Sequence, residues 1–201
     1  MSPTIGVLAL QGDFREHIAA LEALGEKTVS VRTPAELSSV DALVIPGGES
    51  TAISKLAVAF EVLEPIRERI SAGMPAYGSC AGMIMLASHI IDPRSGQVTF
   101  GGLDVKVRRN AFGRQVDSFE ATLHSPKFAG AGELTAVFIR APWVEECGED
   151  VEVLARVESG PNVGAVVAVQ DGAVMATSFH PELTQDSRVH AYFAQLVRER
   201  A

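Results

Sequence analysis

Residues 76–86 read Ala-Tyr-Gly-Ser-Cys-Ala-Gly-Met-Ile-Met-Leu. A short strand is predicted over residues 75–77 and a helix over residues 83–87. Between them, Gly78-Ser79-Cys80-Ala81-Gly82 has the form G-x-C-x-G, the thiol counterpart of the G-x-S-x-G nucleophile elbow. We therefore expect a sharp turn that raises Cys80 above a sheet at a helix N-terminus, a position that favours a thiolate.

The elbow also predicts an oxyanion donor. The backbone N–H of Ala81 follows the nucleophile directly, which is where such enzymes hold a developing negative charge. The alternative is a small buried cysteine in a tight glycine turn, because cysteine is among the most buried residue types. The motif by itself leaves both interpretations open.

Strands and helices alternate on both sides of this turn. Strands are expected at residues 5–10, 27–31 and 42–45, and helices after Asp13, from Ser50 or Thr51 onward, and over residues 63–72. Asp13 is placed to cap the first helix. This order predicts an α/β fold in three layers: a flavodoxin-like, mostly parallel sheet with helices on both faces. The near-continuously apolar strands agree with a sheet covered on both sides.

The pattern changes after residue 88. Further strands are expected at residues 104–108, 119–123, 134–139, 151–157, 163–169 and 173–178, and a closing helix at residues 188–200. Gln170-Asp171-Gly172 predicts a hairpin turn between the last two strands. We expect an added antiparallel strand layer on the same unit. Because the 201 residues contain no repeat or linker, residues 1–201 are predicted to form a single domain.

A second motif, Ser178-Phe179-His180-Pro181-Glu182, closes the last predicted strand. Pro181 biases His180 toward an extended conformation, in which side chains two apart point the same way. Glu182 is then expected to reach the Nδ1–H of His180 and to leave Nε2 facing a thiol, the order required for acyl transfer. Taken alone, the motif fits a surface turn equally well.

A third motif, Pro46-Gly47-Gly48-Glu49-Ser50, follows the strand at residues 42–45. Two glycines allow backbone N–H groups to approach a ligand closely. In elbow enzymes the second oxyanion donor comes from a strand–helix loop of this kind, and we predict the N–H of Gly48. A plain turn is the alternative. A phosphate loop is disfavoured because no Gly-Lys-Ser/Thr follows.

Composition argues against several classes of partner. The chain has 17 basic and 25 acidic side chains and no long basic run, so a nucleic acid partner is not expected. No stretch reaches the roughly 20 apolar residues of a spanning helix, so no membrane role is expected. The start lacks signal-peptide features, and the two cysteines, Cys80 and Cys147, are too few for a disulfide framework. We expect a reducing, cytoplasmic compartment, with Cys147 as a structural residue.

No metal site is predicted. The sequence contains no H-E-x-x-H motif, and the remaining histidines, His17, His89, His124 and His190, are scattered. Each is interpreted as an ordinary polar residue.

Together the three motifs resemble the class I (triad-type) glutamine amidotransferases. Over nearly the whole chain, the closer resemblance is to the glutaminase subunit of pyridoxal 5′-phosphate synthase. It is carried by residues 6–17 (GVLALQGDFREH), 46–51 (PGGEST), 109–115 (RNAFGRQ) and 138–142 (FIRAP). A related subunit that serves imidazole glycerol phosphate synthesis would not be expected to carry the Gln-Gly-Asp-Phe opening. One departure is Ser79, where many relatives carry Thr, and both are small hydroxyl residues.

The resemblance implies a mechanism. Cys80 would attack the side-chain amide of L-glutamine, His180 would move the protons, and Glu182 would orient His180. The residues implied to contact the substrate or the oxyanion are Gly47, Gly48, Glu49, Ala81, Arg109, Ile139 and Arg140. No cofactor is implied.

The resemblance also implies a partner. The ammonia would pass to a (β/α)₈-barrel synthase subunit, within a large hetero-oligomer, for the synthesis of pyridoxal 5′-phosphate (vitamin B6). Gln11 is expected at that interface.

Two other interpretations remain. A cysteine hydrolase of the protease- or deglycase-like group also places an elbow cysteine on a doubly wound sheet, but it would not need His180-Pro181-Glu182 or the Arg109 segment. A regulatory subunit that has lost its chemistry would keep the fold. The presence of all three triad residues argues against such a subunit.

Overall fold

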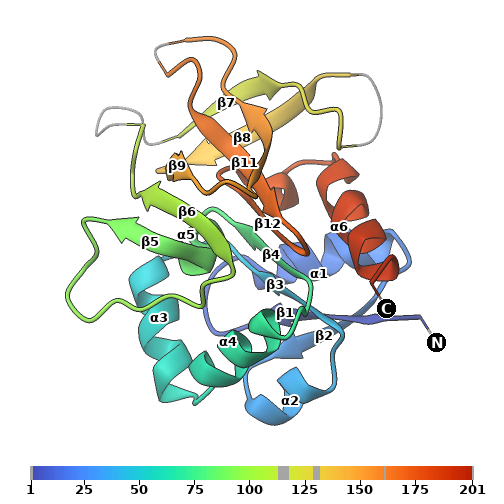
Figure 1. The fold of residues 1–201 in the computed structure, drawn as a ribbon. Helices are drawn as coiled ribbons and strands as arrows, with labels where there is room; N and C mark the ends of the chain where they lie inside the picture. The colour runs from blue at the N-terminus through green and yellow to red at the C-terminus, as the bar shows by residue number, and fades with distance from the viewer. Residues whose placement is uncertain (1, 113–117, 129–131, 161, 201) are drawn as a thin grey trace.

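A computed structural model describes residues 2–112, 118–128, 132–160 and 162–200 (Figure 1). Its centre is a parallel sheet of β1 (Thr4–Leu8), β2 (Lys27–Val31), β3 (Ala42–Ile45), β4 (Ala76–Ser79) and β12 (Val174–Thr177). These strands lie in the order β2-β1-β3-β4-β12, and every neighbouring pair is parallel. This is the flavodoxin-like order, so the fold class predicted from the sequence is confirmed.

Helices cover both faces of this sheet. One face carries α1 (Phe14–Ala23) and α6 (Arg188–Arg198), and the other carries α2 (Pro34–Ser38), α3 (Ser50–Ala59), α4 (Leu63–Ser71) and α5 (Ala81–Leu86) (Figure 1). Successive residues of a strand point to opposite faces. Val44 therefore packs in one core with Leu21 of α1, while Ile45 packs in the other with Ile53 of α3 and Ile66 of α4. Among the described residues, no helix is both long enough and apolar enough to cross a membrane.

The predicted antiparallel strands are present, most of them as a continuation of the same sheet. Beyond β12 follow the predicted β11 (Val166–Asp171) and β6 (Leu103–Arg108), with the unpredicted antiparallel β9 (Trp143–Cys147) between them, and β10 (Glu152–Arg156) pairs with β11. The edge strand β5 (Ala87–Ile91), also unpredicted, is parallel to β6. Strands β7 (Ser118–Leu123) and β8 (Leu134–Ile139) form a separate antiparallel pair. The predicted hairpin joins β11 to β12, but Asp171 already pairs with Val174, so the turn is Gly172-Ala173 instead of residues 170–172.

Several local predictions were wrong or incomplete. The helix expected at residues 83–87 begins earlier, at Ala81, and Ala87 starts strand β5. Strands β5 and β9 and helix α2 were not predicted, because each is short and largely exposed on one side. Asp13 occupies the N-cap position of α1, but its side chain makes no capping hydrogen bond.

The predicted elbow joins β4 to α5. Cys80 lies between them with φ 48° and ψ −102°, a left-handed backbone conformation that is strained for a residue with a side chain. The turn is held by Cys80 N–H, which donates to the carbonyl of Thr177 on β12 at 2.8 Å. A Cβ atom on Gly78 would overlap the backbone of Gly82, and one on Gly82 would overlap the carbonyl oxygen of Ile45 on β3. Both glycines are therefore required for β3, β4 and α5 to approach.

This packing predicts that Gly82→Ala destabilises the fold. The added methyl group meets backbone rather than a flexible side chain, so we expect a loss of about 1–3 kcal/mol in the free energy of unfolding, measured by urea denaturation. Gly132→Ala is the matched control, since its Cβ would meet only the end of the Arg188 side chain at 3.6 Å. Equal stability of the two variants would contradict this account of the elbow.

Candidate active site

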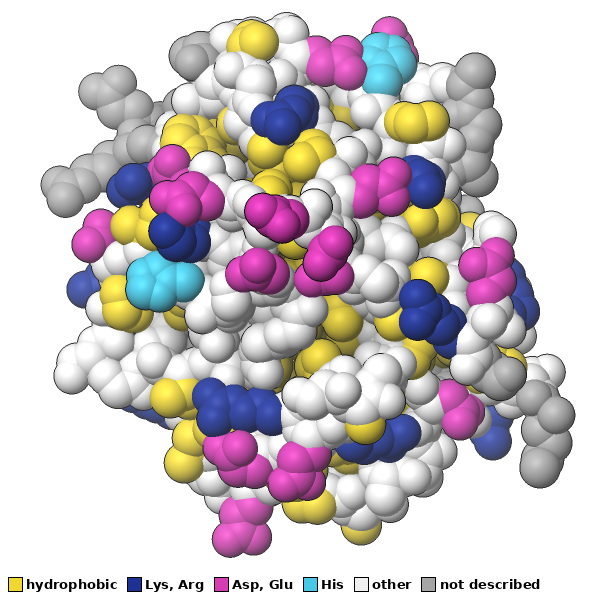
Figure 2. Space-filling model, in the orientation of Figure 1, with side chains coloured by type: hydrophobic (Ala, Val, Ile, Leu, Met, Phe, Trp, Pro, Cys, Tyr) yellow, Lys and Arg dark blue, Asp and Glu magenta, His cyan; other side chains and the backbone are white. Residues whose placement is uncertain are grey.

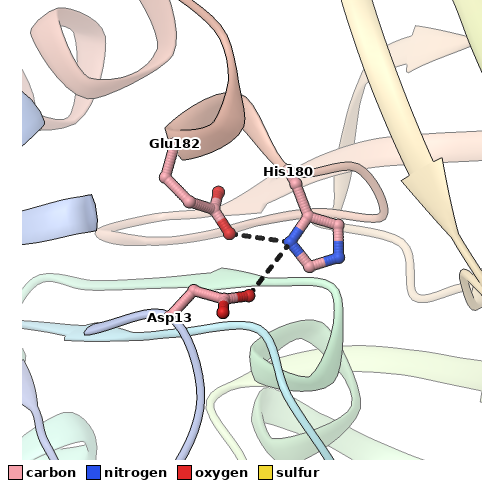
Figure 3. Close-up of side chains that lie close together, drawn as sticks. All are labelled: Asp13, His180 and Glu182. Atoms are coloured by element: carbon pink, nitrogen blue, oxygen red, sulfur yellow. Dashed lines mark hydrogen bonds and ion pairs between the residues drawn. The ribbon is translucent and has the colours of Figure 1, made fainter. Parts of the chain in front are cut away.

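His180 and Glu182 lie together directly after β12. The Nδ1–H of His180 donates to Oε1 of Glu182 at 2.7 Å, and both side chains are buried (Figure 3). The predicted contact is present, but the predicted cause is wrong. Pro181–Leu183 forms a 3₁₀ turn, η1, so the turn and not an extended chain brings Glu182 back to His180.

Asp13 also faces this histidine. Its Oδ2 lies 3.8 Å from Nδ1 of His180, the same nitrogen that contacts Glu182 (Figure 3). Burial and the charge of Glu182 raise the pKa of Asp13. Ligand atoms of Asp13, His180 and Glu182 lie within 4.8 Å of one another and could hold a metal ion, but a metal on Nδ1 would replace the hydrogen bond from His180 to Glu182.

His180 and Glu182 shift each other's pKa in opposite directions. Burial lowers the pKa of His180, but hydrogen bonding and charge from Cys80 and Glu182 outweigh it and raise that pKa from 6.5 to about 10. Burial alone would raise the pKa of Glu182, yet His17 and His180 hold it well below its ordinary value. At neutral pH the pair is therefore imidazolium and carboxylate. Nε2 of His180 is buried, and besides its interaction with Cys80 it makes no hydrogen bond among the described residues.

A cavity of about 530 Å³ opens beside Cys80. Cys80 is 6% exposed, and its Sγ lies 3.9 Å from the carbonyl oxygen of Ile139. The sequence-predicted residues that line the cavity are Gly48, Glu49, Cys80, Ala81, Arg109, Ile139 and Arg140. Gly47 lies behind it instead, where a Cβ would overlap the imidazole of His180. Segments far apart in the sequence thus meet around one thiol.

The Pro-Gly-Gly-Glu-Ser loop is held by polar contacts. The carboxylate of Glu49 caps α3, accepting from the backbone N–H of Thr51 at 3.1 Å and of Ala52 at 2.8 Å. Gln11 accepts from the backbone N–H of Glu49 at 2.8 Å, so it contacts this loop directly. Gly48 has φ +146°, and a Cβ there would overlap the side-chain oxygen of Gln11. The loop conformation thus depends on glycine at this position.

Arg109 is fixed against the cavity wall. Its guanidinium lies 3.3 Å from Glu49 Oε1 and donates to Gln97 Oε1 at 3.0 Å, and Gln97 in turn donates to Ser50 at 3.0 Å. Residues 113–115, which complete the segment that begins at Arg109, lie outside the described residues. Two cavity residues, Asn110 and Arg140, share positive φ angles with Cys80. Backbone strain is concentrated around the thiol.

Sequence reasoning missed three residues near the site. His17, interpreted as an ordinary polar residue, is fully buried behind Glu182, and so is His190. The signal for His17 was present, because it lies four residues before Leu21 on the buried stripe of α1. Gln97 had no such signal, since only the fold brings it to Arg109. Cys147 is exposed at the end of β9, and both cysteines are free.

Comparison with known proteins defines the class. A solved structure described as a glutamine amidotransferase superposes with a TM-score of 0.87 at 47% identity and covers 96% of this chain and 98% of its own. The structure of PurLQS from Thermotoga maritima has a TM-score of 0.67 at 18% identity, which shows the shared fold alone, and the match covers 97% of this chain and 99% of that one. The class is that of the glutamine amidotransferases.

Within that class, the chain belongs to the SNO glutamine amidotransferase family, which matches residues 7–199. It is 62% identical to the pyridoxal 5′-phosphate synthase subunit PdxT of Kineococcus radiotolerans, over 99% of this chain and 97% of the relative. It is 63% identical to the protein of the same name from Acidothermus cellulolyticus, over 99% and 96%. The family resemblance found in the sequence is confirmed.

The coupling of His180 to Cys80 can be tested by NMR. In Cys80→Ala we expect the pKa of His180 to fall from about 10 toward 6.5. The substitution removes one of the two side chains that stabilise the imidazolium, while the other, Glu182, remains. A titration of the imidazole resonances measures it, with the exposed His124 as the internal control. An unchanged pKa in the variant would mean that Cys80 does not interact with His180.

Proposed function

We propose that this chain hydrolyses L-glutamine to L-glutamate and ammonia, and that it supplies the ammonia to a synthase subunit that makes pyridoxal 5′-phosphate. Family membership and the names of its relatives support the proposal. The observation that carries it is the cavity beside Cys80, with His180 and Glu182 paired at 2.7 Å behind it.

In the proposed reaction, Cys80 is the nucleophile and His180 the base. Before glutamine binds, the thiol proton has already passed to Nε2 of His180, and the resulting imidazolium is stabilised by Glu182. Sγ attacks the amide carbon, and the N–H groups of Gly48 and Ala81 hold the oxyanion. The C–N bond then breaks, and His180 returns the proton to the leaving ammonia. Water, deprotonated by His180, hydrolyses the thioester to glutamate and restores the thiol.

The residues of the cavity wall suggest how the substrate glutamine is bound. We assign the substrate carboxylate to Arg109, whose guanidinium is oriented by Gln97 and Glu49. Because the Glu49 carboxylate already caps α3, its proposed contribution is to fix Arg109 and the loop backbone. Ile139 and Arg140 supply another wall of the cavity.

The proposed partner is a (β/α)₈-barrel synthase subunit in a large hetero-oligomer, with Gln11 at the interface. The contact from Gln11 to the backbone of Glu49 gives an interface residue a direct connection to the oxyanion loop. We further propose that residues 1–201 act as one glutaminase domain, since its parallel and antiparallel strands share one sheet. The two free cysteines support a cytoplasmic compartment.

Cys80→Ala tests the nucleophile. We expect glutamine-dependent pyridoxal phosphate synthesis to be abolished, while synthesis fed with ammonia continues, because only the amide chemistry needs the thiol. Glutamate release is measured for this chain alone and with the synthase subunit. No glutamate from folded wild-type protein with a verified partner would contradict the proposal and favour another cysteine hydrolase or a non-catalytic subunit.

Arg109→Ala tests the substrate contact. We expect KM for glutamine to rise about tenfold or more with little change in kcat, as for the loss of one charge-assisted hydrogen bond. Arg108→Ala is the control, because this neighbour is more exposed and pairs with Glu145 instead. Parallel changes in both variants would argue against a specific contact from Arg109.

A further inference from the structure

Behind the triad lies a second row of buried side chains. His17 is 0% exposed, and its Nε2 lies 3.5 Å from Oε2 of Glu182 and 2.9 Å from Oγ of Ser79. On the other side, Nδ1 of His17 lies 2.9 Å from Nε2 of His190, which is also buried. The row therefore runs from α6 through α1 to the carboxylate that orients His180.

Glu182 needs such support. Its Oε1 accepts the hydrogen bond from His180, but Oε2 is buried and makes no hydrogen bond of ordinary length among the described residues. A buried carboxylate oxygen without a donor is costly, because it has lost its water. The ring of His17 is the group that faces this oxygen.

The hydrogen positions in the row follow from counting donors. Burial lowers the pKa of His190 to about 3, so its ring is neutral and has one N–H. Nδ1 of His190 is buried without a partner in the described part of the chain, so a hydrogen on Nδ1 would be a buried donor with no acceptor, which is costly. On Nε2, the same hydrogen is donated to Nδ1 of His17.

This fixes the tautomer of His17. With Nδ1 accepting from His190, the hydrogen of His17 lies on Nε2, which faces Glu182 and Ser79. The opposite arrangement would direct a lone pair of His17 at the carboxylate, which is repulsive. His17 therefore presents one N–H to both Oγ of Ser79, at 2.9 Å, and the second oxygen of Glu182, at 3.5 Å.

We propose that His17 is a positioning residue for glutamine hydrolysis, which acts through Glu182, and that His190 sets the tautomer of His17. The inference rests on the proposed function. His17 holds Glu182 ionised and aligned, and Glu182 stabilises the imidazolium of His180. Because His17 does not line the cavity, its contribution falls on kcat and not on substrate binding.

The test compares two amide substitutions. The side-chain amide of His17→Gln can place an N–H near the position of Nε2, whereas the shorter side chain of His17→Asn reaches only the position of Nδ1. With the synthase subunit present, we expect His17→Asn to lose about tenfold or more in kcat with KM unchanged, the size of one hydrogen bond to a charged group. His17→Gln should retain most of kcat. Equal kcat values for both variants and wild type would overturn the inference.

A double substitution separates positioning from general damage. If His17 acts through Glu182, adding His17→Asn to Glu182→Gln should change kcat by less than about twofold. If the fold-losses in kcat of the two single variants multiply in the double variant, the inference is overturned, because His17 would then act independently of Glu182. Leu37→Ala is the stability control: Leu37 is buried against the opposite face of the sheet, so the variant should unfold earlier but keep its kcat.

If His17→Asn does not fold, His190→Phe takes its place. This substitution removes the donor to Nδ1 of His17. We expect it to lower kcat in the otherwise wild-type protein, but to cause no further loss in a protein that already carries Glu182→Gln. An unchanged kcat would overturn the role of the row. An inactive wild-type complex would instead contradict the proposed function, so the two failures are distinguishable.

Discussion

Three backbone segments approach so closely at the elbow that no side chain fits between them. Gly78 of β4 leaves room for the backbone of Gly82 on α5, and Gly82 leaves room for the carbonyl of Ile45 on β3. The chain turns between them through the strained conformation of Cys80. The cavity, the Pro-Gly-Gly-Glu-Ser loop after β3 and the hydrogen bond from Cys80 to β12 all take their positions from this crossing. Without the two glycines, β3 and α5 would separate and the thiol would lose its neighbours.

Electrostatics adds a second constraint. A carboxylate as buried as Glu182 would ordinarily take up a proton, and its low pKa depends on His180 in front and His17 behind. The raised pKa of His180 in turn depends on that carboxylate and on Cys80. The charges support one another, so a change at any member alters the protonation of the others. Acidic side chains also gather on the outer surface in one view of the molecule, where water screens their charges (Figure 2).

The three motifs of the site could be predicted from short stretches of sequence. The elbow, the Pro-Gly-Gly loop and the His-Pro-Glu turn were visible because glycine and proline restrict the backbone where they stand. The pairing of His180 with Glu182 was predicted through the wrong geometry, since an extended chain and a 3₁₀ turn bring the two together equally well. Asp13 looked like a cap because a helix start was evident, but only the fold shows that its carboxylate faces His180. The contacts of His17 with Ser79 and Glu182 join distant parts of the chain, and no local pattern specifies them.

The place of β12 has a consequence for how the protein is made. This strand lies between the parallel part of the sheet and its antiparallel continuation, yet it follows every other described strand in the sequence. On the ribosome, β4 has only β3 beside it until β12 emerges, so the sheet stays in two unjoined parts. His180 and Glu182 follow β12 directly, so the base proposed for Cys80 is synthesised only after every other described strand. Because β12 comes after the other described strands, the residues proposed to activate Cys80 reach it only when the sheet around the thiol can form.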